Sequence, residues 1–149
     1  MKAAIGIDPG AHGGWAVIYD SGAVEVFPWD EKRFIESMED LANAGIILCC
    51  ALEKVGAMPK QGLSSTWSFA QNYGVIQGVL KTLHIPYQLI PPQTWKKEFS
   101  LLKQDKSKSI ETAQRLFPNV NFLPTERSRK PSDGMCEAAL LACFASRHF

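Results

Sequence analysis

The apolar and polar residues in the first third of the chain predict three short strands and a helix. The strands fall at 2–8, 14–20 and 23–27, and the sequences between them, PGAHG and SG, are typical of turns that join antiparallel neighbours. Residues 30–45 then carry apolar side chains at helical spacing behind an acidic start, with Gly45 as the stop signal. The expected order is therefore a three-strand meander followed by a helix.

The next apolar run, IILCCALE at 46–53, has no alternation at all, which indicates a central strand covered on both faces. A helix stands between this run and the meander, so a right-handed crossover should place it parallel to strand 2–8. The pattern after residue 53 predicts a loop at 54–63, a helix from Ser64 or Ser65 to Lys81, and a strand at 84–90 ended by Pro91 and Pro92. Short helices capped by Thr94 or Ser107 should follow, with an amphipathic segment at 108–117 and a loop at 118–131. The last helix has a narrow apolar stripe and is capped by Ser132 or Asp133.

The composition fits one globular domain. The chain has 149 residues, 46% of them hydrophobic, which is enough for a sizeable core over 1–149. The element order makes it an α/β domain whose mixed five-stranded sheet combines an antiparallel meander of three strands with two parallel strands. No apolar run approaches the roughly 20 residues of a membrane span, and the amino-terminal stretch is too short for a signal peptide, so we expect a cytoplasmic protein. The four cysteines lie inside apolar segments and fit reduced core residues.

The net charge of +1 hides an uneven distribution. Residues 1–53 contain nine Asp and Glu against three Lys and Arg, whereas residues 54–149 contain six against thirteen. Much of the basic excess falls between 96 and 130. Such a surface suits a polyanion, although an ordinary solvated face is the alternative.

Four carboxylates stand where apolar elements end or begin. Asp8 closes the first strand and Glu53 the central one, whereas Asp133 and Glu137 lie four apart on one face of the last helix. Asp8 has an ordinary explanation as a turn residue, Asp133 as a helix cap and Glu137 as a solvated acid. Glu53 is harder to explain in this way, because it ends an apolar run and would lie beside Asp8 if the two strands are parallel neighbours. An ionised carboxylate near a core is costly unless it faces an opening, a partner charge or a metal. Hard oxygen ligands of this kind favour Mg²⁺ or Mn²⁺.

Four segments in order carry a resemblance that spans nearly the whole chain: AIGIDPGAHGGWAVI, ALEKV, PPQTWKK with KSIETAQRLFP, and SDGMCEAALLA. They resemble the ribonuclease H-like nucleases, and within them the RuvC-type Holliday junction resolvases, particularly the short phage and bacterial versions. The resemblance implies a homodimeric endonuclease that cuts branched DNA by paired symmetric nicks leaving 5′ phosphates. It also implies a location in the cytoplasm of a bacterium or of a phage-infected host.

The same resemblance implies that Asp8, Glu53, Asp133 and Glu137 are catalytic and hold metal, with two Mg²⁺ ions per site for which Mn²⁺ can substitute. Better-known members of the family space the last two acids three apart, with Asp in place of Glu. Both spacings keep the pair on one helical face. Which of Asp133 and Glu137 ligates the metal directly stays open.

Basic residues supply the candidates for DNA contacts. The resemblance places functional lysines after the strand ending at residue 90 and at the start of the next helix, and it leaves the choice between the two lysines there open. The DNA-binding candidates are Lys60, Lys96, Lys97, Lys106 and Lys108, of which the last two are also candidates for catalysis. Candidates for separating strands at a branch are Met58, Trp67 and Phe69.

Gly74 and Gly78 interrupt a helix, where each costs roughly 1 kcal/mol relative to Ala. Either the helix lies tight on the sheet at these positions, or it meets its own copy across a two-fold axis. The resemblance implies the second arrangement, because RuvC-type enzymes are homodimers that use the corresponding helix.

Other functions remain open from the sequence. The segment GIDPGAHGGWAV also resembles the phosphate-binding hairpin of the actin-like kinases, but those chains are far longer and repeat the fold twice. A DNA-binding module without catalysis would not need four acids at element ends. Ribonuclease H activity on RNA–DNA hybrids is the main alternative among nucleases.

Overall fold

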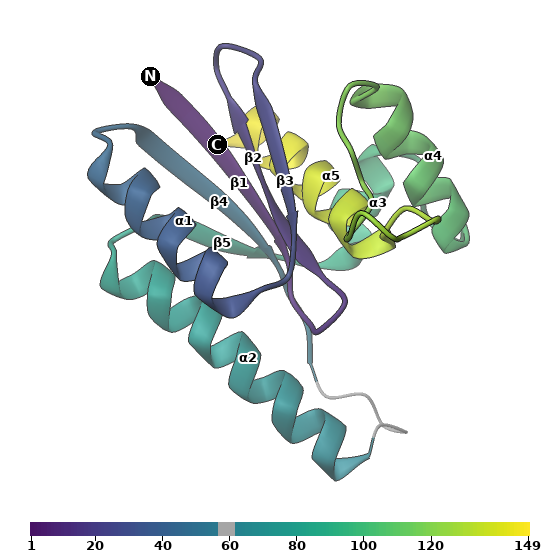
Figure 1. Ribbon diagram of the computed structural model, residues 1–149, viewed down its shortest axis with the longest axis horizontal. Helices are drawn as coiled ribbons and strands as arrows, with labels where there is room; N and C mark the ends of the chain where they lie inside the picture. The colour runs from purple at the N-terminus through teal and green to yellow at the C-terminus, as the bar shows by residue number, and fades with distance from the viewer. Residues whose placement is uncertain (57–61) are drawn as a thin grey trace.

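A five-stranded sheet forms the centre of the molecule, with the strand order β3-β2-β1-β4-β5 (Figure 1). The computed structural model describes residues 1–56 and 62–149. β1, β2 and β3 pair antiparallel, whereas β4 lies parallel to both β1 and β5. The predicted mixed sheet is therefore confirmed. The strands are β1 (Lys2–Asp8), β2 (Gly14–Tyr19), β3 (Val24–Pro28), β4 (Ile47–Glu53) and β5 (Tyr87–Ile90).

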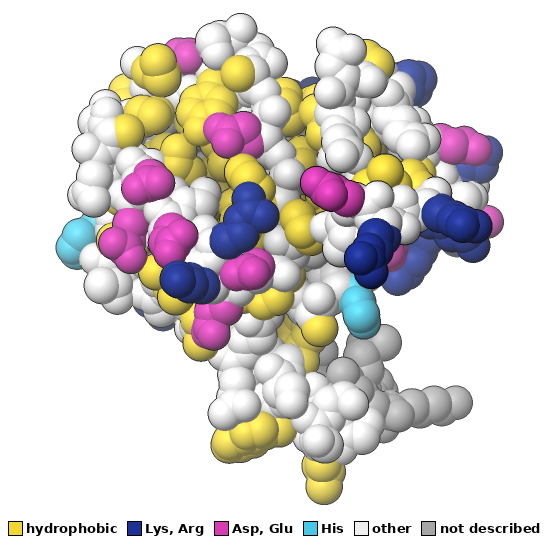
Figure 2. Space-filling view, in the orientation of Figure 1, with side chains coloured by type: hydrophobic (Ala, Val, Ile, Leu, Met, Phe, Trp, Pro, Cys, Tyr) yellow, Lys and Arg dark blue, Asp and Glu magenta, His cyan; other side chains and the backbone are white. Residues whose placement is uncertain are grey.

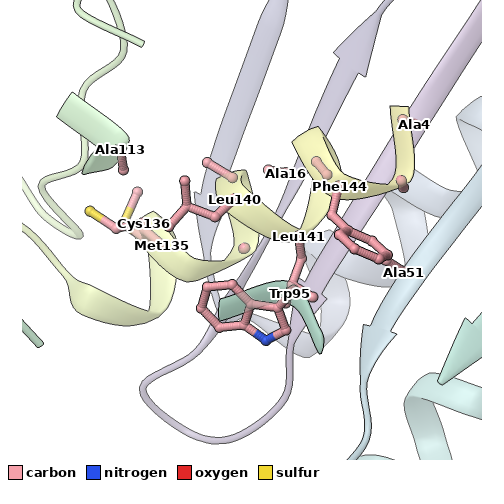
Figure 3. Close-up of a cluster of buried hydrophobic side chains, with 14 of the residues drawn as sticks. Ala4, Ala16, Ala51, Trp95, Ala113, Met135, Cys136, Leu140, Leu141 and Phe144 are labelled. Atoms are coloured by element: carbon pink, nitrogen blue, oxygen red, sulfur yellow. The ribbon is translucent and has the colours of Figure 1, made fainter. Parts of the chain in front are cut away.

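Helices cover both faces of the sheet. On one face lie α1 (Glu31–Asn43) and α2 (Leu63–Thr82), whose buried side chains form one core cluster with the strands. The other face carries α5 (Asp133–His148), with α3 (Pro92–Glu98) and α4 (Lys106–Leu116) around a second cluster, part of which is drawn in Figure 3. All four cysteines are free thiols, as predicted. No described helix is long and apolar enough to cross a membrane.

The helix ends follow local signals in the sequence. The side chains of Asp30, Asp105 and Ser132 accept hydrogen bonds from backbone N–H groups in the first turns of α1, α4 and α5. Asp105 therefore caps α4, rather than the Ser107 that the sequence suggested. Gly45 has a φ of +70°, the left-handed conformation that commonly follows a helix.

Three elements differ from the sequence prediction. β5 begins at residue 87 rather than 84, because His84 has a φ of +57° and belongs to the turn after α2. α3 begins at Pro92 instead of being capped by Thr94, since proline is well suited to the first turn of a helix. α5 is buried on far more than a narrow stripe, because α4 packs on it as well as the sheet.

β1 and α5 approach each other at Gly6 so closely that no side chain fits between their backbones. A Cβ atom placed on Gly6 would lie 2.1 Å from the backbone nitrogen of Ala142 and 2.2 Å from the carbonyl oxygen of Ala138. Only hydrogen fits there, so the helix backbone rests directly on the strand. Ala4 and Ala51 extend the flat surface beneath the helix (Figure 3).

Gly6→Ala should therefore destabilise the protein strongly, because α5 must move off β1 to admit the methyl group. Overpacking typically costs about 1–3 kcal/mol, and a backbone contact yields less easily than a side-chain contact. Urea unfolding followed by circular dichroism measures the change in the free energy of unfolding. Gly56→Ala is the control: a Cβ there meets no described atom within 4 Å, so the change should stay below about 0.5 kcal/mol. Equal stability of the two variants would contradict the argument.

Candidate active site

Asp8 and Glu53 end two neighbouring parallel strands. In the register of β1 with β4, Ile7 pairs with Leu52, and the two carboxylates follow directly. Ile7 and Leu52 are fully buried in the core cluster under α1 and α2. Because successive strand residues point to opposite faces, Asp8 and Glu53 project to the face that α5 covers. Both carboxylates are half-buried at the edge of that face.

α5 brings two more acids to the same place. Asp133 is the first residue of the helix and Glu137 follows one turn later, so both lie on one side of it. Gly134 determines where the helix starts, because a Cβ there would lie 2.1 Å from the carbonyl oxygen of His12 in the turn between β1 and β2. The structure thus brings together carboxylates from three distant segments.

Asp8 interacts with all three of the other acids. Burial raises the pKa of Asp8 well above its usual value, and the negative charges of Glu137, Glu53 and Asp133 raise it further, together with a hydrogen bond to Glu137. Loss of hydration and crowding by like charges both disfavour the ionised form. The cluster therefore carries a surplus of negative charge that a cation would relieve.

Glu53 is held by a tryptophan that the sequence pattern does not single out. The indole N–H of Trp95 in α3 donates a hydrogen bond to Oε2 of Glu53 over 2.9 Å. Burial raises the pKa of Glu53, and this hydrogen bond acts in the opposite direction because it stabilises the ionised form. Trp95 is itself fully buried, with its ring beside Leu141 (Figure 3). The segment PPQTWKK contains this residue, but its letters do not reveal the direction of the side chain.

The two lysines between which the sequence could not choose lie in different surroundings. The Nζ atom of Lys106 lies 2.8 Å from Oδ2 of Asp133, and that hydrogen bond and charge interaction raise the pKa of Lys106. Lys108 instead pairs with Glu111 on its own helix over 3.2 Å. The geometry therefore places Lys106 at the acid cluster and pairs Lys108 elsewhere.

Two of the other basic candidates, Lys96 and Lys97, lie on α3, the helix that carries Trp95. Lys96 is half-buried, with its Nζ atom 5.6 Å from the centre of the Trp95 ring, and its charge favours the ionised form of Glu53. Lys97 is exposed on the same helix. Lys60 lies outside the described residues, as does Met58, the candidate for strand separation.

α2 carries the remaining candidates. Trp67 is 68% exposed, whereas Phe69 is half-buried and stacks on Tyr73 with 6.0 Å between the ring centres. A Cβ added to Gly74 or Gly78 would meet no described atom within 4 Å. Tight packing of α2 on the sheet therefore does not explain the two glycines.

The chemistry of the four acids fits a hard divalent cation. Carboxylates are the ligands that Mg²⁺ and Mn²⁺ prefer, and the pKa of Asp8 is raised first by burial and then by the negative charges of the neighbouring acids, both of which a bound cation would offset. In the described part of the chain, no group of three Asp, Glu, His or Cys side chains is positioned to coordinate a metal ion in its present conformation. Glu53 accepts from Trp95 through Oε2 and Asp133 pairs with Lys106 through Oδ2, so each carboxylate has a second oxygen that could bind a cation.

Comparison with known proteins identifies the fold. No protein-family model matches the chain, and no curated protein matches it in sequence. A structure of T. thermophilus RuvC in complex with Holliday junction substrate matches with a TM-score of 0.65 at 13% identity, covering 99% of this chain and 96% of that one. A second Thermus thermophilus RuvC structure matches with a TM-score of 0.57 at 14% identity, covering 97% and 95%.

This likeness extends over nearly the whole length of both chains, so the protein has the ribonuclease H-like fold of RuvC. The fold expected from the four sequence segments is confirmed. At this low identity the comparison concerns the fold, and the roles of individual residues remain predictions.

Trp95→Phe should keep the core filled while removing the donor to Glu53. We expect the pKa of Glu53 to rise, since the ionised carboxylate loses its hydrogen bond while burial still disfavours its charge. Titration of the Glu53 carboxyl carbon by NMR in both proteins measures the shift.

Trp15→Phe is the matched control for this measurement. Trp15 is also almost fully buried, but its indole N–H donates to Ser37 over 3.3 Å, in the core cluster on the opposite face of the sheet. This variant should leave the titration of Glu53 unchanged. An unaltered pKa of Glu53 in Trp95→Phe would show that the hydrogen bond does not act on the carboxylate.

Proposed function

We propose that this protein is a metal-dependent, structure-selective endonuclease that cleaves branched DNA, resolving Holliday junctions by paired symmetric nicks that leave 5′ phosphates. The observation that carries the proposal is the convergence of four carboxylates at one edge of a RuvC-type fold, in contact with a lysine. Such a set of acids suits hydrolysis of a phosphodiester assisted by metal. The T. thermophilus RuvC structure in complex with Holliday junction substrate supports branched DNA as the substrate.

Each part of the cluster has a distinct task in this proposal. Asp8, Glu53, Asp133 and Glu137 would hold Mg²⁺ or Mn²⁺, two ions per site, and the metal when bound supplies Lewis acidity and a water of lowered pKa. Trp95 limits the rotation of Glu53, because its ring is fixed in the core and its N–H holds one carboxylate oxygen. The ammonium of Lys106 places positive charge where a substrate phosphate would approach the acids.

The surface charge supports an approach of DNA from one side. Basic side chains gather over α4 and the loop after it, whereas acidic ones gather over α1 (Figure 2). A DNA backbone can therefore reach the acids along the basic side without crossing the acidic surface of α1. The basic residues from α3 up to the start of α5 are Lys96, Lys97, Lys103, Lys106, Lys108, Arg115, Arg127, Arg129 and Lys130.

A cleavage assay with several substrates tests the proposal. The protein would be incubated with Mg²⁺ and a synthetic four-way junction, a duplex, a flap or an RNA–DNA hybrid. We expect paired nicks in the junction, and cleavage of the hybrid alone would favour ribonuclease H activity instead. Asp8→Asn or Glu53→Gln should slow cleavage by at least about 100-fold while junction binding persists, because acids hold metal and the basic surface holds phosphate. Near-normal turnover in either variant would place the active site elsewhere.

Lys106→Ala should slow junction cleavage by about 10- to 100-fold, because it removes the positive charge at the acids. Lys108→Ala is the matched control, since it alters the same helix at a lysine paired with Glu111, and it should change the rate by less than about threefold. Binding at several salt concentrations shows separately whether either lysine contacts a phosphate, because each lost contact lowers the salt slope by about one. A larger effect of Lys108→Ala on the cleavage rate would reverse the assignment.

We also propose that the protein is a homodimer through the exposed face of α2. Helical glycines carry a cost that packing within this chain does not offset at Gly74 and Gly78, and both leave room for a close partner helix. The exposed indole of Trp67 on the same helix adds apolar surface. Two sites related by a two-fold axis match the two symmetric strands of a four-way junction.

Gly78→Leu should weaken the dimer by about 5- to 150-fold, because overpacking by about 1–3 kcal/mol would hold the partner helix away. Sedimentation velocity at several concentrations measures this change. The variant should still fold, since no described atom lies within 4 Å of a Cβ at this position. Gly78→Ala serves as the comparison and should stabilise the monomer by up to about 1 kcal/mol. A wild-type monomer that nicks both strands would contradict the proposal.

A further inference from the structure

A cavity of about 400 Å³ lies next to the acid cluster, and it is termed here the turn pocket. It is large enough for a nucleotide-sized ligand. Its lining comes from the turn after β1, the start of α1 and the segment before α5, and none of it belongs to the proposed catalytic set. The side chains that bear on its chemistry are those of His12, Trp29, Asp30, Arg33, Thr125 and Ser132.

The turn pocket and the acid cluster are built on the same elements. Ser132 lines the pocket and caps α5, and the next residue is Asp133. The carbonyl oxygen of His12, another lining residue, lies against the start of α5 at Gly134. The same short turn joins His12 to Asp8 at the end of β1. A ligand in the pocket is therefore adjacent to a phosphate held at the acids.

Trp29 gives the turn pocket a rigid aromatic surface. Its half-buried ring lies edge-on to Trp15, with 6.1 Å between the ring centres, and 5.0 Å from the ring centre of Phe34. The backbone N–H of Trp29 donates to the carbonyl oxygen of Gly13 over 3.1 Å, which ties the residue to the turn. Nucleobases of every kind stack on such a surface.

A guanidinium and an imidazole ring stand beside this aromatic surface. Arg33 and His12 are both exposed, and the guanidinium of Arg33 lies 5.2 Å from the centre of the Phe27 ring. Arg33 forms no ion pair with any described residue. The carboxylate of Asp30 is already engaged, because it accepts a hydrogen bond from the backbone N–H of Arg33 as the cap of α1.

The loop that supplies Thr125 continues the positive charge. Three hydrogen bonds between Thr125 and Ser128 fix the loop. The backbone N–H of Thr125 donates to the hydroxyl of Ser128 over 3.2 Å, the two hydroxyls lie 2.7 Å apart, and the backbone N–H of Ser128 donates to the carbonyl oxygen of Thr125 over 3.2 Å. Arg127, Arg129 and Lys130 follow, all exposed, and none pairs with an acid in the described ranges. A strand leaving the pocket along this loop would meet cations.

We propose that the turn pocket binds one nucleotide of the strand that is cut, next to the scissile phosphate, with its base against Trp29 and its phosphate facing Arg33 and His12. This inference rests on the proposed nuclease function and gives it a site that reads the cleaved strand. Bases without a stable pairing partner are cheaper to unstack than bases inside a duplex, so a branch point can supply one. The hydroxyl and carboxylate groups in the pocket can hydrogen-bond to the edge of a base, and the donors and acceptors on that edge differ among the four bases. Cleavage therefore depends on the base at one position beside the cut.

Binding and cleavage are tested separately. A short single-stranded DNA with one 2-aminopurine is titrated with the protein in chelator, and its fluorescence reports stacking without any need for metal or turnover. The variant Arg33→Ala combined with His12→Ala should bind about tenfold more weakly, because two groups facing the phosphate are lost. Lys32→Ala is the control, since Lys32 is exposed on the same helix and does not line the pocket, and it should bind as the wild type does. Junctions randomised on both sides of the cut then show whether the base preference of the wild type flattens in the double variant.

The outcomes separate the two proposals. If the double variant stacks 2-aminopurine as the wild type does and keeps its base preference, or if the wild type does not bind the strand, the turn pocket is not a nucleotide site. The wild type could instead cut no branched DNA but still stack 2-aminopurine, with the stacking lost in the double variant. In that case the pocket inference stands and the proposed resolvase activity fails. Circular dichroism of both variants confirms that the exposed substitutions leave the fold intact.

Discussion

The direct contact between the backbones of α5 and β1 at Gly6 is the constraint on which the rest of the structure depends. Ala138 of the helix lies against this glycine, Glu137 and Asp133 come just before it along the helix, and Asp8 comes two residues after it along the strand. The closeness at Gly6 therefore sets how near the acids of the helix come to the acid of the strand. A single methyl group at this position would separate them, although it lies away from the chemistry.

Around this contact, the candidate site is held by rigid elements rather than by free loops. Trp95 is locked in the core and holds Glu53, and the start of α5 is held by the backbone contact between Gly134 and His12. The side chain of Lys106 is more exposed than that of Asp133, with which it pairs, and is held less firmly. Rigid placement keeps carboxylates together that would otherwise repel one another. The same turn forms one wall of the turn pocket, so the contact that holds the start of α5 also holds that wall.

Much of this arrangement could be predicted from local patterns. Asp8 and Glu53 end apolar runs, and the helix between those runs indicates that the two strands are parallel, so a common edge for the two acids was expected if the strands are neighbours, which they are. The spacing of Asp133 and Glu137 likewise indicates one helical face. These features depend on the spacing of apolar residues, on which residue ends each strand and on the length of the segment between strands. All three can be seen in one sequence.

The remaining features depend on side-chain direction and on contacts between distant segments. Trp95 could have pointed away from Glu53, and Lys106 and Lys108 are equivalent until α4 is placed against α5. The left-handed backbone at His84, which shortens β5, has no signal as strong as glycine. The turn pocket joins two segments from the first third of the chain to a third segment more than 90 residues further along, and it could be recognised only in the tertiary structure.

A carboxylate with a raised pKa weakens the fold that carries it. Folded Asp8 keeps its proton to a higher pH than the unfolded chain does, so the free energy of unfolding falls as the pH rises from the ordinary range of aspartate toward the higher pKa of the folded state. Near neutral pH, an uncharged side chain of the same shape at position 8 would give a higher free energy of unfolding. Directed evolution for heat resistance alone would therefore discard Asp8 early, and a library screened in this way needs a parallel screen for activity to keep it.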